Sequence, residues 1–194
     1  IPNMMKYFPH FLINLDSPRH MAVRKLMMKP FSKKMAEAYR PRAREVVTQV
    51  LDSIRRRSEV EFVEEVGRQI TARNIMRVIG LENEEFYLPK LKEWANLANT
   101  AGSGRPSKEI LARADVAYAE MATAFLPEID KRRKHPGEDF VSSLVHAGEG
   151  DDRLSNEELV GELILILLAG HDTTLNTMAL SINALSKDRA ARSR

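Results

Sequence analysis

The stretch from residue 155 to about residue 185 constrains the fold of this chain more than any other part. It starts at Ser155-Asn156-Glu157-Glu158, a capping box in which the serine caps the backbone and the glutamate three residues later reaches back. Residues 159–168 are apolar on nearly every side, which predicts a helix packed against other elements on most faces. At 1.5 Å per residue the helix would be about 45 Å long, so it must cross the molecule.

Apolar residues recur at helical spacing through most of the remaining chain. A helix is expected from about Pro18 to Lys29, with a capping residue just ahead of the proline. A second start at Ser32 leads towards Pro41 and then into a helix with its apolar stripe at residues 46–54. No stretch shows convincing period-two alternation, so we predict a mainly α chain with little or no β-sheet. Further helical stripes lie at residues 62–80, where Gly80 is a C-terminal cap, and at residues 86–98, 110–125 and 140–145.

The composition excludes several classes of protein. The 194 residues include no cysteine, so the chain carries no disulfide, no thiolate metal site and no cysteine nucleophile. The longest uninterrupted apolar run ends before His171, well short of the roughly 20 apolar residues that span a bilayer. The chain opens without the basic-then-apolar pattern of a secretory signal. We therefore expect no membrane segment and a cytoplasmic location.

Residues 169–174 interrupt the apolar helix with the sequence Ala-Gly-His-Asp-Thr-Thr. The two small residues leave room for something other than protein, and the threonine hydroxyls can bond to the carbonyl four residues earlier. A buried carboxylate at Asp172 needs partners or a shifted pKa, which is usual for a proton donor or relay. A local kink is the competing explanation, because the adjacent Asp172 and Thr173 point in different directions on a regular helix.

This hexapeptide inside a long apolar helix resembles the central-helix signature of the cytochrome P-450 family, the haem-thiolate monooxygenases. That signature reads Ala or Gly, Gly, any residue, Asp or Glu, Thr, and Thr or Ser. The segment from Leu15 to Leu26 resembles the family helix that supplies a His-x-x-x-Arg pair to the haem propionates. His20 and Arg24 are four residues apart and share one helix face, where an imidazole and an arginine fork suit a pair of carboxylates. The two motifs also follow the order and approximate spacing of the family.

The resemblance implies the helical central part of that fold, and hence a single partial domain over residues 1–194. It also implies a bacterial-type soluble monooxygenase that binds haem b and takes electrons from a ferredoxin- or flavodoxin-type donor. Such an enzyme activates O2 and hydroxylates a small apolar organic substrate. Asp172 and Thr173 would be the catalytic acid–alcohol pair that delivers protons to the oxygen.

Four further residues receive roles from the same resemblance. Ala169 and Gly170 would give the oxygen its groove beside the haem. Leu165 and Leu168 would line the substrate pocket, and they fit plain core positions equally well. His171 stands at the open position of the signature, where a lone histidine is more often a packed or solvent-bonded residue than a ligand.

Two hallmarks of the family are not found in this sequence. The loop with the haem-ligating cysteine is missing because the chain has no cysteine, so these residues supply no axial metal ligand. A Glu-x-x-Arg helix after Asp172 is missing as well, because the last glutamate is Glu162. The run from Glu65 to Arg68 spells the same pattern, but it precedes the central helix, and we interpret it as surface charge.

Two other functions fit parts of the sequence. Without the cysteine, the chain could be a free-standing helical protein that binds haem or an apolar ligand without oxygenase activity. Residues 19–58 hold 12 Lys or Arg against three Asp or Glu, which fits docking of an acidic electron donor or binding of nucleic acid. The nucleic-acid alternative lacks interleaved aromatic residues and leaves residues 169–174 unexplained, so no nucleic-acid partner is expected.

Overall fold

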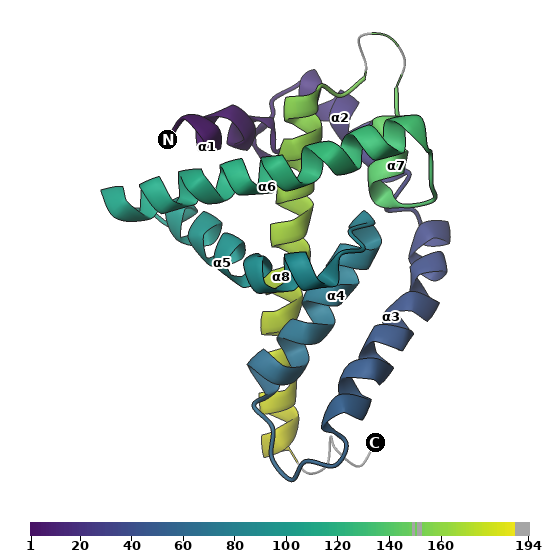
Figure 1. The fold of residues 1–194 in the computed structure, drawn as a ribbon, viewed down its shortest axis with the longest axis vertical. Coiled ribbons are helices and arrows are strands. Elements are labelled where there is room, and N and C mark those ends of the chain that lie inside the picture. The colour runs from purple at the N-terminus through teal and green to yellow at the C-terminus, as the bar shows by residue number, and fades with distance from the viewer. Residues whose placement is uncertain (149, 151–152, 189–194) are drawn as a thin grey trace.

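Figure 1 shows a computed structural model, which describes residues 1–148, 150 and 153–188. Over these residues the regular structure is entirely helical and contains no β-strand, which confirms the predicted fold class. Three short helical turns accompany the α-helices: two 3₁₀ turns, η1 and η2, and a π-helical turn, η3. In chain order the elements are α1 (Pro2–Tyr7), η1 (Phe8–His10), η2 (Leu12–Asn14), α2 (Arg19–Met28), α3 (Lys33–Ile54), η3 (Phe62–Gly67), α4 (Arg68–Ile79), α5 (Glu84–Gly102), α6 (Lys108–Lys134), α7 (Phe140–Val145) and α8 (Asn156–Lys187).

The predicted central helix is confirmed as α8, which runs through the whole molecule while α6 crosses it (Figure 1). Both halves of the capping box are present. The Ser155 hydroxyl accepts from the Glu158 amide at 3.2 Å, and the Glu158 carboxylate accepts from the Ser155 amide at 2.8 Å. The same carboxylate pairs with Arg19 of α2 at 2.7 Å, which ties α2 to the start of α8.

By length and mean hydropathy, α8 is the one helix among the described residues that could cross a membrane. A core helix passes the same test. The N-terminal half of α8 is buried against α1, α4, α6 and α7, and three polar side chains, Glu162, His171 and Asp172, lie along its length. These features are typical of a helix inside a protein core.

α4 lies along the C-terminal half of α8 and supplies a large part of the core (Figure 1). It ends at Gly80, whose φ of 99° is left-handed, so the predicted C-terminal cap is confirmed. The two helices approach closely at Gly170, where an added Cβ would lie 2.4 Å from Ile75 Cδ1. Glycine at position 170 therefore allows α4 and α8 to pack.

α5 and α6 pack on each other through an aromatic cluster of Tyr87, Trp94 and Phe125, which are all buried. The Trp94 indole donates to Glu120 at 2.9 Å, so its polar group is satisfied. At the end of α6, the buried Arg132 pairs with Asp139 at 3.0 Å and also with Glu128. This packing holds α5 where its last turns face α8.

The N-terminal helices show two differences from the sequence-based expectation. α2 begins at Arg19, close to the predicted start, but no side chain caps it, and the Asp16 carbonyl accepts from the His20 amide at 2.9 Å instead. Ser32 caps α3 as predicted. α3 then continues through Pro41 as a single helix of 22 residues, because the neighbouring turns of the helix hold the chain on both sides of the proline.

Candidate active site

A cavity of about 480 Å³ lies beside the middle of α8. Three parts of the chain line it: the turns at residues 8–13, the facing surfaces of α5 and α6, and one side of α8. Most of the lining side chains are apolar, and the polar ones come mainly from α8 and the end of α5. The lining residues are Phe8, Phe11, Ile13, Ala98, Asn99, Gly102, Tyr118, Leu165, Leu168, Ala169, Asp172, Thr173 and Asn176.

The structure places five of the sequence-predicted site residues together on this cavity. They are spaced three or four residues apart in pairs along α8, which puts them on one side of the helix. Although Asp172 and Thr173 are adjacent, both line the cavity. The five residues are Leu165, Leu168, Ala169, Asp172 and Thr173.

Asp172 and Thr173 present different groups to the cavity. The Asp172 side chain is 25% exposed, and its Oδ2 accepts from Asn99 Nδ2 of α5 at 2.5 Å. The exposed Thr173 hydroxyl donates to the carbonyl of Ala169, one turn earlier, as the sequence predicts for a helical threonine. The Thr173 oxygen keeps its lone pairs for a cavity molecule, so the pair combines a carboxylate and a hydroxyl at one wall.

Gly170 is placed differently from Ala169. It is not among the residues that line the cavity, and the space beside it is filled by Ile75 of α4. Ala169 is exposed on the cavity side. The structure therefore shows a packing role for Gly170 and a cavity position for Ala169.

His20 and Arg24 lie on α2, away from this cavity lining. His20 is half-buried and Arg24 is exposed. Within the part of the chain that the structure describes, neither side chain forms a hydrogen bond or ion pair, whereas the neighbouring Arg19 is bound to Glu158. Two cationic donors on one helix are thus free to bind an anionic group.

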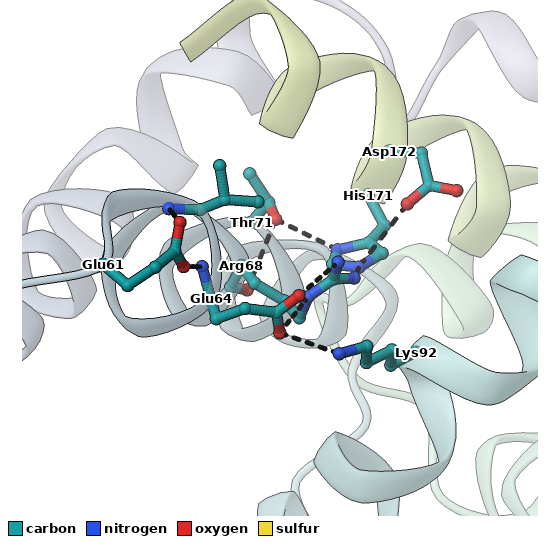
Figure 2. A network of polar contacts seen from close by, with 8 residues as sticks. Glu61, Glu64, Arg68, Thr71, Lys92, His171 and Asp172 are labelled. Carbon is teal, nitrogen blue, oxygen red and sulfur yellow. Dashed lines mark hydrogen bonds and ion pairs between the residues drawn. The ribbon is translucent and has the colours of Figure 1, made fainter. Parts of the chain in front are cut away.

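His171 is fully buried and points away from the cavity, towards α4 (Figure 2). Its ring contacts Thr71 and Arg68, so it is a packed, hydrogen-bonded residue. Burial lowers the pKa of His171 below its ordinary value; nearby Asp172 raises it, and the positive charge of Arg68 lowers it. The imidazole is therefore neutral near pH 7.

Sequence reasoning missed Asn99 and misjudged Arg68. No motif marks Asn99, which reaches Asp172 only because α5 packs across α8. The surface-charge interpretation holds for Glu65, which pairs with Arg57 at 2.5 Å. It is wrong for Arg68, whose side chain is 17% exposed and contacts the buried His171. The position of Arg68 at the start of an amphipathic stripe could have indicated a partly buried role.

Comparison with known proteins identifies related chains. The family model "Cytochrome P450" matches residues 102–194. Cytochrome P450 107B1 of Saccharopolyspora erythraea is 34% identical over 177 residues, which are 91% of this chain and 41% of that protein. Mycinamicin IV hydroxylase/epoxidase of Micromonospora griseorubida is 32% identical over 87% of this chain and 41% of its own length.

The fold agrees with these relatives. The crystal structure of P450BioI, in complex with acyl carrier protein carrying hexadec-9Z-enoic acid, matches with a TM-score of 0.83 and 26% identity. The match covers 91% of this chain and 45% of that one. The chain thus spans less than half the length of the relatives it matches. It belongs to the cytochrome P450 family and carries the helical part of that fold.

Proposed function

We propose that this chain is part of a haem b-dependent monooxygenase, a single partial domain that forms the wall of the oxygen and substrate cavity. The observation that carries the proposal is the carboxylate of Asp172 beside the hydroxyl of Thr173 on one cavity wall, at the polar interruption of α8. The family supplies the class of chemistry, since its members named above include a hydroxylase/epoxidase.

The residues present fit a haem group. Ala169 offers a small exposed side chain on α8, where a flat macrocycle could approach the helix. His20 and Arg24 offer an imidazole and a guanidinium without partners among the described residues, which suit two propionates. When bound, the haem supplies the activation of dioxygen, and its axial thiolate comes from outside this sequence.

Asp172 and Thr173 hold and move protons in this proposal. The Asp172 carboxylate is anchored by Asn99 through Oδ2, so Oδ1 is left to exchange a proton with cavity water. The Thr173 hydroxyl can turn its hydrogen from the Ala169 carbonyl towards the cavity and donate it there. Together the two groups form a short path from water to the reacting oxygen.

The cavity favours a small apolar organic substrate. Phe8, Phe11, Leu165 and Leu168 provide apolar lining, and a volume of about 480 Å³ lies within the ordinary range of small-molecule sites. Burial of apolar surface would supply most of the affinity, and the few polar groups would orient the substrate.

The basic surface of α2 and α3 supports docking of a ferredoxin- or flavodoxin-type donor. Lys33 and Lys34 are exposed at the start of α3. Long-range attraction to an acidic protein would accelerate association and weaken with salt. We expect Lys33→Glu/Lys34→Glu to slow reduction by an acidic donor at low ionic strength and to have little effect at high ionic strength. Cytoplasmic location is part of this proposal, because such donors are soluble proteins.

Neither alternative gains support from the relatives, which are cytochromes P450 and include a named hydroxylase/epoxidase. Oxygen-isotope labelling tests the proposal. The haem-loaded protein that contains this chain is supplied with ¹⁸O₂, electrons and a panel of small apolar compounds. We expect a hydroxylated product with one ¹⁸O atom per molecule. Binding of several compounds without any ¹⁸O-labelled product would favour a ligand-binding protein instead.

A further inference from the structure

His171 lies at the centre of a polar network that joins α8 to α4, η3 and α5 (Figure 2). Its side chain is 0% exposed. The ring atom Nδ1 lies 3.0 Å from Thr71 Oγ1, and Nε2 lies 3.2 Å from Arg68 Nη1. Both ring nitrogens therefore have a partner on α4, on the side of α8 that faces away from the cavity.

The two partners define the protonation state of the ring. A guanidinium only donates hydrogen bonds, so Nε2 must accept from Arg68 and carries no hydrogen. The Thr71 hydroxyl donates its one hydrogen to the Arg68 carbonyl at 3.3 Å, so its oxygen accepts from His171 Nδ1. Both constraints require a neutral imidazole with its hydrogen on Nδ1.

Arg68 is itself held in place. Its Nε and Nη2 donate to Glu64 of η3 at 3.0 and 3.2 Å, and Lys92 of α5 donates to the same carboxylate at 3.0 Å. An imidazolium at His171 would direct a hydrogen at the Arg68 guanidinium and place two positive charges side by side. The charged groups around His171 are thus Arg68, Glu64, Lys92 and Asp172.

The neutral ring has a consequence for Asp172. Oδ1 of Asp172 lies 3.7 Å from His171 Nε2, a distance from which an imidazolium could form an ion pair. Because Nε2 carries no hydrogen, this pair is absent, and the hydrogen bond of Asp172 is the one from Asn99. The carboxylate therefore stays on the cavity side.

We propose that His171 is a positioning residue for Asp172: Arg68 and Thr71 keep the imidazole neutral, which denies Asp172 an ion pair and leaves its carboxylate to Asn99 and the cavity. This inference rests on the proposed function, in which Asp172 exchanges protons with cavity water. It assigns Arg68, Thr71 and Glu64 an indirect part in proton delivery, although none of them lines the cavity.

Nitrogen-15 NMR of the imidazole tests the tautomer independently of activity. The spectra are recorded on the haem-loaded protein in its diamagnetic ferrous carbon monoxide form, and His171 is assigned by loss of its signals in His171→Gln. We expect the Nδ1–H tautomer from pH 8 to below pH 6. In Arg68→Met the ring should take up a proton at a proton concentration at least about tenfold lower. Thr71→Val, which is nearly isosteric, should lose the single tautomer, and Arg113→Met on the exposed face of α6 should match the wild type.

An Nε2–H tautomer in the wild type, or identical titration in Arg68→Met, would overturn the assignment. Product formed per electron pair then tests the positioning role. Arg68→Met should lower it on the order of tenfold, because His171 becomes an ion-pair partner of Asp172. Arg68→Met/His171→Phe should recover most of the loss, since the competing imidazole is gone. If the double variant stays as low as Arg68→Met, His171 does not position Asp172. If Thr173→Ala also leaves product yield unchanged, the proposed function fails, whereas the NMR result stands.

Discussion

Replacement of Glu162 by glutamine should make the protein more stable at neutral pH. Glu162 is fully buried in α8, and neither carboxylate oxygen has a hydrogen-bond partner among the described residues. Burial raises the pKa of Glu162 from 4.5 to about 8, although the nearby Leu12 amide opposes part of this rise and Glu158 adds to it. The folded protein therefore keeps a proton on Glu162 at pH 7, which the unfolded chain releases.

The size of the effect follows from this difference. Between pH 4.5 and 8 the unfolded chain binds one proton fewer at position 162, so folded-state stability falls as the pH rises. The unfolding equilibrium constant should rise about tenfold per pH unit over this window, and the accumulated cost at pH 7 is about 3 kcal/mol. Glutamine has a similar shape and does not titrate, so Glu162→Gln removes the pH dependence. Above pH 8 both states are ionised, and the difference becomes constant.

Urea unfolding of the wild type and Glu162→Gln at pH 5, 6, 7 and 8 measures this quantity. The difference in the free energy of unfolding should grow in favour of Glu162→Gln across the series, whatever its value at pH 5. Glu59→Gln, an exposed carboxylate without a hydrogen bond among the described residues, serves as the control and should give a flat difference. A flat difference for Glu162→Gln as well would refute the buried, protonated carboxyl group.

Three further outcomes follow from other parts of the structure. Gly170→Ala should lower the thermal midpoint, because overpacking against Ile75 costs about 1–3 kcal/mol and exceeds the gain in helix propensity, and Ile75→Val should relieve the loss. Removal of His20 and Arg24 together should speed haem loss about tenfold or more in a transfer assay to an apoprotein acceptor, and unchanged loss would exclude them as propionate ligands. Arg132→Met should destabilise by about 3–5 kcal/mol in denaturant unfolding, because it leaves two carboxylates facing each other, and a change under 1 kcal/mol would contradict this account.

The sequence predicts the helices well because their signals are local. The capping box at Ser155, the glycine cap at Gly80 and the stripe at residues 140–145 each depend on neighbours within one or two turns. The continuation of α3 through Pro41 could not be read in this way, since it depends on the turns on both sides.

The site divides along the same line. One face of α8 was predictable from helical spacing, and Leu165, Ala169 and Thr173 share a cavity as a result. Contacts between helices were not predictable, because they depend on how α4 and α5 pack against α8. For this reason Asn99 was missed, and Arg68 was assigned to the surface.

The most direct test of the central claim is the yield of product per electron pair in Thr173→Ala, measured in the haem-loaded protein. Thr177→Ala is the matched control, because Thr177 makes the same bond to a carbonyl four residues earlier, at 2.9 Å, and does not line the cavity. We expect the yield to fall on the order of tenfold in Thr173→Ala, with the electrons diverted to peroxide or water, and to stay at the wild-type value in Thr177→Ala. A wild-type yield in Thr173→Ala would contradict the role of the α8 cavity wall in proton delivery.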